Sequence, residues 1–129
     1  MGIEKDLAEY RLEQAEQCLK TAKKNFEFGD YKATANRSYY CVFNAIRGLF
    51  ALERIDFKKH TGVISYFRKN YVKTGIFDKK LSYILGNLFE IRTFSDYEDY
   101  YLISRQEITE QIENAEYFLE QIKQYLTKT

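Results

Sequence analysis

The stretch NRSYYCVFNAIRGLFAL, residues 36–52, gives the clearest indication of the fold. Its large apolar side chains recur at intervals of four, three and four residues, which is the spacing of one face of an α-helix and not of a β-strand. The chain also contains no proline, the residue that most often interrupts a helix. Together these features predict a helical protein. The apolar face of this segment consists of Tyr39, Phe43, Ile46 and Phe50.

Outside this segment the same periodicity predicts three further long helices and one short helix. The connections between them are short, and short connections favour antiparallel neighbours. We therefore expect an all-α, up-and-down helical bundle of four long helices plus one short helix, formed by residues 1–129 as a single domain. The apolar positions expected to face the core are Leu7, Ala15, Cys18, Leu19, Ala22 and Phe26; Val63, Ile64, Phe67 and Tyr71; Leu81, Ile84, Leu85, Leu88 and Phe89; and Ile108, Ile112, Ala115, Phe118, Leu119, Ile122 and Leu126.

Turn and capping residues place the helix ends. Gly29 is a natural C-terminal stop, and Asp30 and Asp78 are placed to cap the helices that follow them. Ser104 and Glu107 have the three-residue spacing of a capping box. A charged loop is expected around residues 53–59, and a helix end followed by a loop within residues 93–101.

The charge balance excludes a strong overall field for nucleic acid or membrane, because the formal net charge is only +1. Locally, residues 53–80 hold eight basic against three acidic residues, and residues 81–103 hold one against four. This uneven charge has two interpretations. Either the basic segment binds phosphate, or the charged residues only form the solvated surfaces of helices. Cys18 and Cys41 are expected to be buried free thiols, which suits the reducing cytoplasm. We expect no signal peptide and no membrane-spanning helix.

His60 is the only histidine, which excludes histidine-rich metal sites. The sequence also shows no glycine-rich phosphate loop, no nucleophile elbow and no zinc knuckle. We therefore expect no metal and no cofactor. His60 precedes a helix, where it could contact an anion or simply lie on the surface.

Several polar residues interrupt the apolar pattern. Arg92 follows Leu85 and Leu88 on the stripe that should face the core, and a buried arginine must be paired. It is either a site residue or an arginine at a helix end that is salt-bridged to Asp96. A polar stripe also runs along the 36–52 helix, and arginine and tyrosine are common both at binding sites and in helix packing. This stripe consists of Arg37, Tyr40, Asn44 and Arg47.

Three segments resemble the HEPN family, named for higher eukaryotes and prokaryotes nucleotide-binding. ANRSYYCVFNAIRGLF is similar to the family pattern Ser/Ala-Arg-x-Tyr-Tyr-x-x-Phe-x-Ala, although Asn36 replaces the small residue. KKHTGVISYF is similar to the family's Lys-x-His segment. LFEIRTFSDYEDY is similar to the Leu-x-Arg-x-x-Ala-Asp-Tyr segment of one branch. The resemblance implies a bundle of four long helices and a shorter one, paired as a homodimer.

The resemblance also implies a function that depends on the branch. Many family members resemble metal-independent endoribonucleases that use an arginine followed, after four to six residues, by a histidine. This chain supplies Arg92, but Tyr97 and its two successors occupy the histidine positions. The branch with Arg-x-x-Ala-Asp-Tyr resembles proteins paired with a minimal nucleotidyltransferase, like toxin and antitoxin. In related pairs the partner adds AMP to a tyrosine, and Tyr97 and Tyr100 are the corresponding candidates.

Three hypotheses follow. In the first, Arg92 joins the polar stripe and His60 in a module that binds a nucleotide or an RNA phosphate without chemistry. In the second, the protein is a ribonuclease toxin in which Tyr97 or Asp96 assists Arg92. In the third, it is a subunit that only binds a nucleotidyltransferase. The missing histidine disfavours the second hypothesis.

Overall fold

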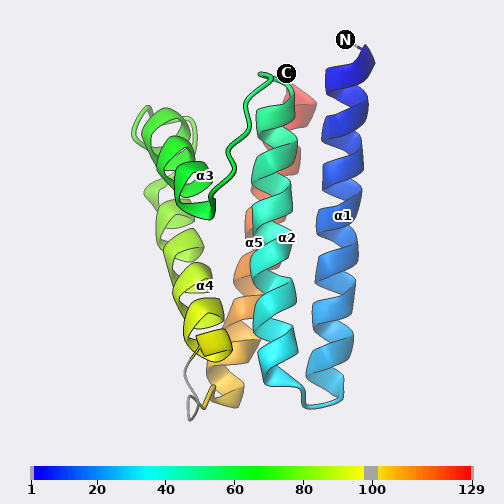
Figure 1. Cartoon of the computed structure of the whole chain (residues 1–129), viewed down its shortest axis with the longest axis vertical. Helices are drawn as coiled ribbons and strands as arrows, with labels where there is room; N and C mark the ends of the chain where they lie inside the picture. Colours follow the sequence, from blue (N-terminus) through cyan, green and yellow to red (C-terminus); the bar gives the residue numbers. More distant parts are fainter. Residues whose placement is uncertain (1, 98–101, 129) are drawn as a thin grey trace.

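The computed structural model describes residues 2–97 and 102–128, and every regular element in these residues is helical. Four long helices run alternately down and up, and both ends of the chain lie at the same end of the bundle (Figure 1). The predicted all-α bundle with one additional short helix is confirmed. The elements are α1 (Gly2–Glu27), α2 (Tyr31–Ala51), α3 (His60–Phe67), the π-helical turn η1 (Arg68–Val72), α4 (Lys79–Tyr97) and α5 (Arg105–Lys128).

The second helix, α2, is the centre of the bundle, since it packs against α1, α3, α4 and α5. The apolar face predicted from its spacing is buried, and Tyr39, Ile46 and Phe50 have no exposed surface. On another face, a Cβ at Gly48 would lie 3.2 Å from the carbonyl oxygen of Ala8. The missing side chain of Gly48 therefore lets α1 approach α2 closely.

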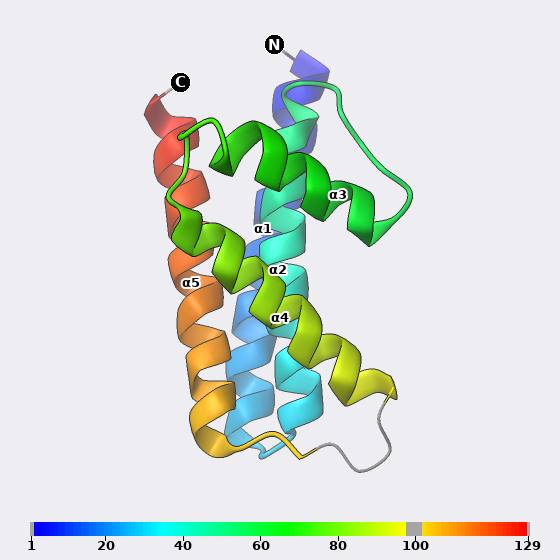
Figure 2. The ribbon, with the colours of Figure 1, turned by 90° about the vertical axis from the view of Figure 1, so that its left-hand side faces the viewer.

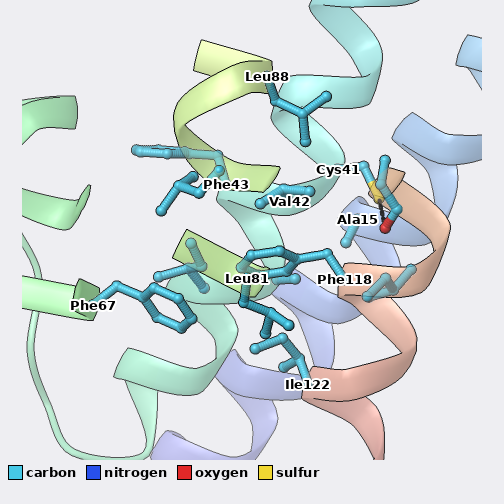
Figure 3. Close-up of a cluster of buried hydrophobic side chains, with 14 of the residues drawn as sticks. Ala15, Cys41, Val42, Phe43, Phe67, Leu81, Leu88, Phe118 and Ile122 are labelled. Carbon is cyan, nitrogen blue, oxygen red and sulfur yellow. Dashed lines mark hydrogen bonds between the residues drawn. The ribbon is translucent and has the colours of Figure 1, made fainter. Parts of the chain in front are cut away.

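Side chains from all five α-helices meet in one core (Figure 3). Phe67 of α3 packs against Phe118 of α5 with ring centroids 5.5 Å apart. Each such side chain contributes about 1.5–3 kcal/mol when it is fully buried. Cys18 and Cys41 are buried and free, as the sequence predicts.

The predicted caps are confirmed. Gly29 ends α1 with a φ of +78°, and the Asp30 carboxylate accepts a backbone N–H of the first turn of α2 at 3.1 Å. Asp78 accepts a backbone N–H at the start of α4 in the same way, at 2.8 Å. Ser104 and Glu107 each accept the other's backbone N–H at 3.0 Å, which is the reciprocal capping box. These caps fix where α2, α4 and α5 begin.

One core prediction is wrong. Leu7 is 38 % exposed, and its neighbour Ala8 is the buried residue instead. The reason is that Leu7 borders a cavity open to solvent beside the segment after α2, near Arg54 and Ile55.

At its C-terminal end, α4 continues five residues past Arg92 and ends at Tyr97, within the run where a helix end is expected. The short helix α3 crosses the bundle near the end that holds both termini (Figure 2). This crossing carries its first residue, His60, toward α2. None of the helices within residues 2–97 and 102–128 combines the length and apolar content needed to cross a membrane.

Candidate functional site

Arg92 lies between α4 and α2, with a side chain only 18 % exposed. Its Nη2 donates to the hydroxyl oxygen of Tyr40 at 3.3 Å. Its Nε lies 3.0 Å from Oδ2 of Asp96, an ion pair in which the Nε–H does not point at the oxygen and forms no hydrogen bond. Arg92 is therefore paired with Asp96, but within the described residues only its Nη2 donates a hydrogen bond.

Tyr40 is the centre of the arrangement, because two arginines from different elements contact its ring. The guanidinium carbon of Arg37 lies 5.2 Å from the ring centroid, and that of Arg92 lies 5.4 Å from it. Both distances are in the range of cation–π attraction. Arg92 also lies 5.6 Å from the ring centroid of Tyr39. One half-buried aromatic ring thus holds two cationic groups near each other.

Arg37 is positioned by residues of α1 and α2. The side-chain oxygen of Asn36 accepts from Nε and Nη2 of Arg37 at 3.0 and 2.7 Å, and Cys18 Sγ accepts from Nη1 at 3.7 Å. Asn36, the departure from the family pattern, therefore serves to orient the arginine. Asn44 also donates to Cys18 Sγ, at 3.7 Å, so this residue of the polar stripe is directed toward α1.

His60 lies beside the two tyrosines although it is 32 residues before Arg92 in the sequence. Its Nδ1 is 2.9 Å from the hydroxyl oxygen of Tyr39, and its ring stacks on Phe43 with centroids 4.2 Å apart. Burial lowers the pKa of His60, and the positive charges of Arg92 and Arg47 lower it further. The imidazole is consequently neutral near pH 7.

Arg47, the last residue of the polar stripe, is engaged elsewhere. Its Nε and Nη2 bind the two carboxylate oxygens of Asp56 at 3.3 and 2.9 Å. Arg11 lies 3.6 Å from the same carboxylate and donates to the backbone oxygen of Arg47 at 3.0 Å. Arg47 is therefore tied to the segment after α2.

Of the two candidate tyrosines, Tyr97 lies within the described residues. Tyr97 ends α4, is 74 % exposed, and makes no hydrogen bond within residues 2–97 and 102–128. Its hydroxyl is accessible to another protein. Tyr100 lies outside the described residues.

Arg37, Tyr40, Arg92 and Asp96 form a group that we call the arginine site. Arg92 is paired with Asp96, whereas Arg37 forms no ion pair within the described residues. Arg37 and Asp96, but not Arg92, border a cavity of about 380 Å³ that is open to solvent and that Asp30 and Lys32 also line. Guanidinium groups bind phosphate with paired hydrogen bonds, so a phosphate would compete with Asp96 for Arg92.

Sequence reasoning missed two parts of this arrangement. Tyr39 was expected only as a core residue, yet its hydroxyl binds His60. Asn36 was noted only as a departure from a pattern, yet it orients Arg37. The adjacency of Asn36 and Arg37 in the sequence was the one available signal.

Comparison with known proteins gives a consistent result. A sequence model of the HEPN domain matches residues 8–125. A UPF0332 protein of Archaeoglobus fulgidus is 30% identical over 123 residues, covering 95% of this chain and 98% of the relative. A UPF0332 protein of Thermotoga maritima is 29% identical over 126 residues, covering 98% and 96%. A Methanocaldococcus jannaschii protein named as a "putative toxin" is 28% identical over 115 residues, covering 89% and 78%. The chain therefore belongs to the HEPN domain family.

Proposed function

We propose that this HEPN domain binds a phosphate group of a nucleotide or of RNA at the arginine site. The observation that carries the proposal is the convergence of Arg37 and Arg92 on the ring of Tyr40. Both arginines contact the ring of Tyr40, whereas only Arg92 is paired with a carboxylate, that of Asp96. This arrangement keeps two cationic groups oriented and partly desolvated, which strengthens their attraction for an anion.

Binding is favoured over RNA cleavage by the sequence that follows Arg92. Cleavage at a ribose 2′-hydroxyl needs a group that accepts a proton near neutral pH. No histidine follows Arg92 at the motif spacing; that run holds Tyr97 instead. We therefore expect purified protein without added metal to leave RNA intact. Cleavage that is lost in a folded Arg92→Ala variant would contradict this expectation.

We further propose that the domain is the HEPN component of a toxin–antitoxin-like pair with a minimal nucleotidyltransferase. Two considerations support this pairing: the names of the toxin-like relatives and the resemblance of its SDY segment, residues 95–97, to the paired branch. The exposed hydroxyl of Tyr97 is the acceptor we would test for AMP transfer. We also expect a homodimer, and light scattering that gives a monomer would contradict it.

The binding proposal can be tested by fluorescence anisotropy with a short labelled single-stranded RNA and with AMP. Arg92→Gln should weaken binding by about tenfold or more, because a charge-assisted hydrogen bond contributes roughly 1.5–3 kcal/mol. Arg54→Gln is the matched control. Arg54 is 81 % exposed, and its ion-pair partner is Glu4, which is not a residue of the arginine site. Equal losses in both variants would indicate only non-specific charge attraction.

A further inference from the structure

A second cavity lies where the segment after α2 approaches α3. Its volume is about 570 Å³, within the range of small-molecule sites. Neither Arg37 nor Arg92 lines this cavity, so it is distinct from the arginine site. We call it the loop pocket. Its lining residues are Phe43, Arg47, Asp56, Phe57, Lys58 and His60.

The loop pocket is positively charged. Burial opposes the ionisation of Asp56, but the hydrogen bond from Arg47 and the neighbouring positive charges hold its pKa below the usual range. Asp56 is therefore ionised, and Arg11 and Arg47 both lie beside it. Lys58 takes part in no ion pair within the described residues. The lining residues therefore hold two cationic groups, Arg47 and Lys58, against one carboxylate, an excess of one positive charge, and Nη1 of Arg47 is not used by Asp56.

His60 presents a fixed hydrogen-bond donor to this pocket. The Tyr39 side chain is fully buried, and burial raises the pKa of its hydroxyl, so the hydroxyl keeps its proton. The only hydrogen-bond partner of this hydroxyl in the described part of the chain is Nδ1 of His60, at 2.9 Å. The buried hydroxyl proton is satisfied only if Nδ1 of the neutral ring accepts it, and from this we infer that the ring proton lies on Nε2. Because Nδ1 is directed at Tyr39, Nε2 is the nitrogen left for the loop pocket.

The same pocket has an aromatic wall. Phe57 is 36 % exposed, and Phe43 stacks against the His60 ring with centroids 4.2 Å apart. A bare inorganic ion would use the donors but not this apolar surface. A ligand that carries a phosphate on an aromatic or apolar group would use both.

We propose that the loop pocket binds a phosphate monoester attached to an aromatic group, with Nε2–H of His60, Arg47 and Lys58 as donors and Phe57 against the ring. A nucleoside monophosphate and the phosphorylated end of an RNA chain both present this chemistry. This site goes beyond the proposed function, because it does not require the arginine site.

Nitrogen NMR of the imidazole tests the fixed donor. In the wild-type protein near pH 7.5, His60 should show a protonated Nε2 and an unprotonated Nδ1. Tyr39→Phe keeps the ring but removes the hydroxyl, and the two nitrogen shifts should then move toward each other as both tautomers become populated. A wild-type ring with its proton on Nδ1 would overturn the assignment.

Binding is tested with AMP, adenosine and inorganic phosphate, using the NMR signals of His60 and Lys58 as the readout. AMP should perturb both residues, adenosine should bind much more weakly, and inorganic phosphate should compete with AMP. Lys58→Gln should weaken AMP binding by about fivefold, the range of a partly exposed charge pair. Lys59→Gln is the matched control, because Lys59 is adjacent, exposed and does not line the pocket. Equal effects of the two substitutions, or equal affinity for AMP and adenosine, would overturn the proposal.

A separate arm distinguishes this site from the arginine site. In Arg92→Gln the response of His60 and Lys58 to AMP should persist, even where RNA binding through Arg92 is lost. Loss of the AMP response in this folded variant would show that the pocket is not an independent site. Comparison of a short RNA with and without a 5′-phosphate then identifies the source: selective binding of the phosphorylated chain indicates a chain end, and selective binding of AMP indicates a mononucleotide.

Discussion

Replacing Asp96 with Asn separates a ligand-binding role of Arg92 from a purely structural one. Asp96 is the carboxylate paired with Arg92, and in the proposed function it competes with the phosphate for that arginine. Asparagine keeps the shape of the side chain but removes its charge. If Arg92 binds an anion, the substitution should lower stability and raise affinity at the same time.

The size of both effects follows from the exposure of the pair. The Arg92 and Asp96 side chains are 18 % and 31 % exposed, so the pair is neither fully solvated nor fully buried. Exposed pairs four residues apart on a helix contribute about 0.3–0.5 kcal/mol, and breaking a buried pair costs about 3–5 kcal/mol. We expect a loss of about 1 kcal/mol, or roughly 3–5 °C in melting temperature for a chain of this length. A phosphate that no longer displaces the carboxylate should bind about fivefold more tightly.

Urea denaturation measures the stability change, and anisotropy with labelled RNA measures the affinity. Glu90→Gln is the matched control, because it removes an exposed carboxylate from α4 that is not paired with Arg92. It should leave stability nearly unchanged and raise RNA affinity much less. A stability loss accompanied by equal or weaker RNA binding in Asp96→Asn would refute the reasoning and make the ion pair structural.

Three further predictions concern other parts of the molecule. Tyr39→Phe should destabilise the protein by about 1 kcal/mol in urea denaturation, the typical net contribution of one hydrogen bond, and a loss several times larger would contradict this. Because folding lowers the pKa of His60, the unfolded chain takes up the His60 proton at a higher pH than the folded chain does. The free energy of unfolding should therefore fall as the pH drops below about 6.5, and it should fall less in His60→Gln. Ser104→Ala should cost about 1 kcal/mol by removing the α5 cap, whereas an unchanged melting temperature would contradict the capping box.

The fold was predictable because the sequence signals for a helix, its apolar spacing and its capping residues, are local. The spacing of Tyr39, Phe43 and Phe50 gave the buried face of α2, and Gly29 and Asp30 gave the turn before it. Each of these signals acts within a few residues. Leu7 was the exception, because its burial depends on what lies across from it and not on its own helix.

The site was only partly predictable, for a geometric reason. Consecutive residues of an α-helix are about 100° apart, so the stripe from Arg37 to Arg47 spreads over roughly 80° around α2. Asn44 therefore turns toward Cys18 of α1, while Arg47 reaches Asp56 after the helix end. Sequence spacing identified the residues but not which neighbouring helix each would meet.

The position of His60 could not be derived from the sequence either. Its contact with Tyr39 depends on the path of residues 52–59 and on the angle at which α3 crosses α2. The periodicity of the apolar residues does not predict the angle at which two helices cross. Helix packing thus brings the single histidine beside the tyrosines, although no motif spacing relates it to Arg92.

The central claim is that Arg37 and Arg92 bind one anion together beside Tyr40. The most direct test is the RNA affinity of the wild type, Arg37→Gln, Arg92→Gln and the double variant, measured under one salt condition. The account predicts that each single substitution weakens RNA binding by about tenfold. The fold-loss of affinity in the double variant should be clearly smaller than the product of the two single losses, because residues that share one ligand are coupled. Losses that multiply independently, or single variants that bind like the wild type, would contradict it.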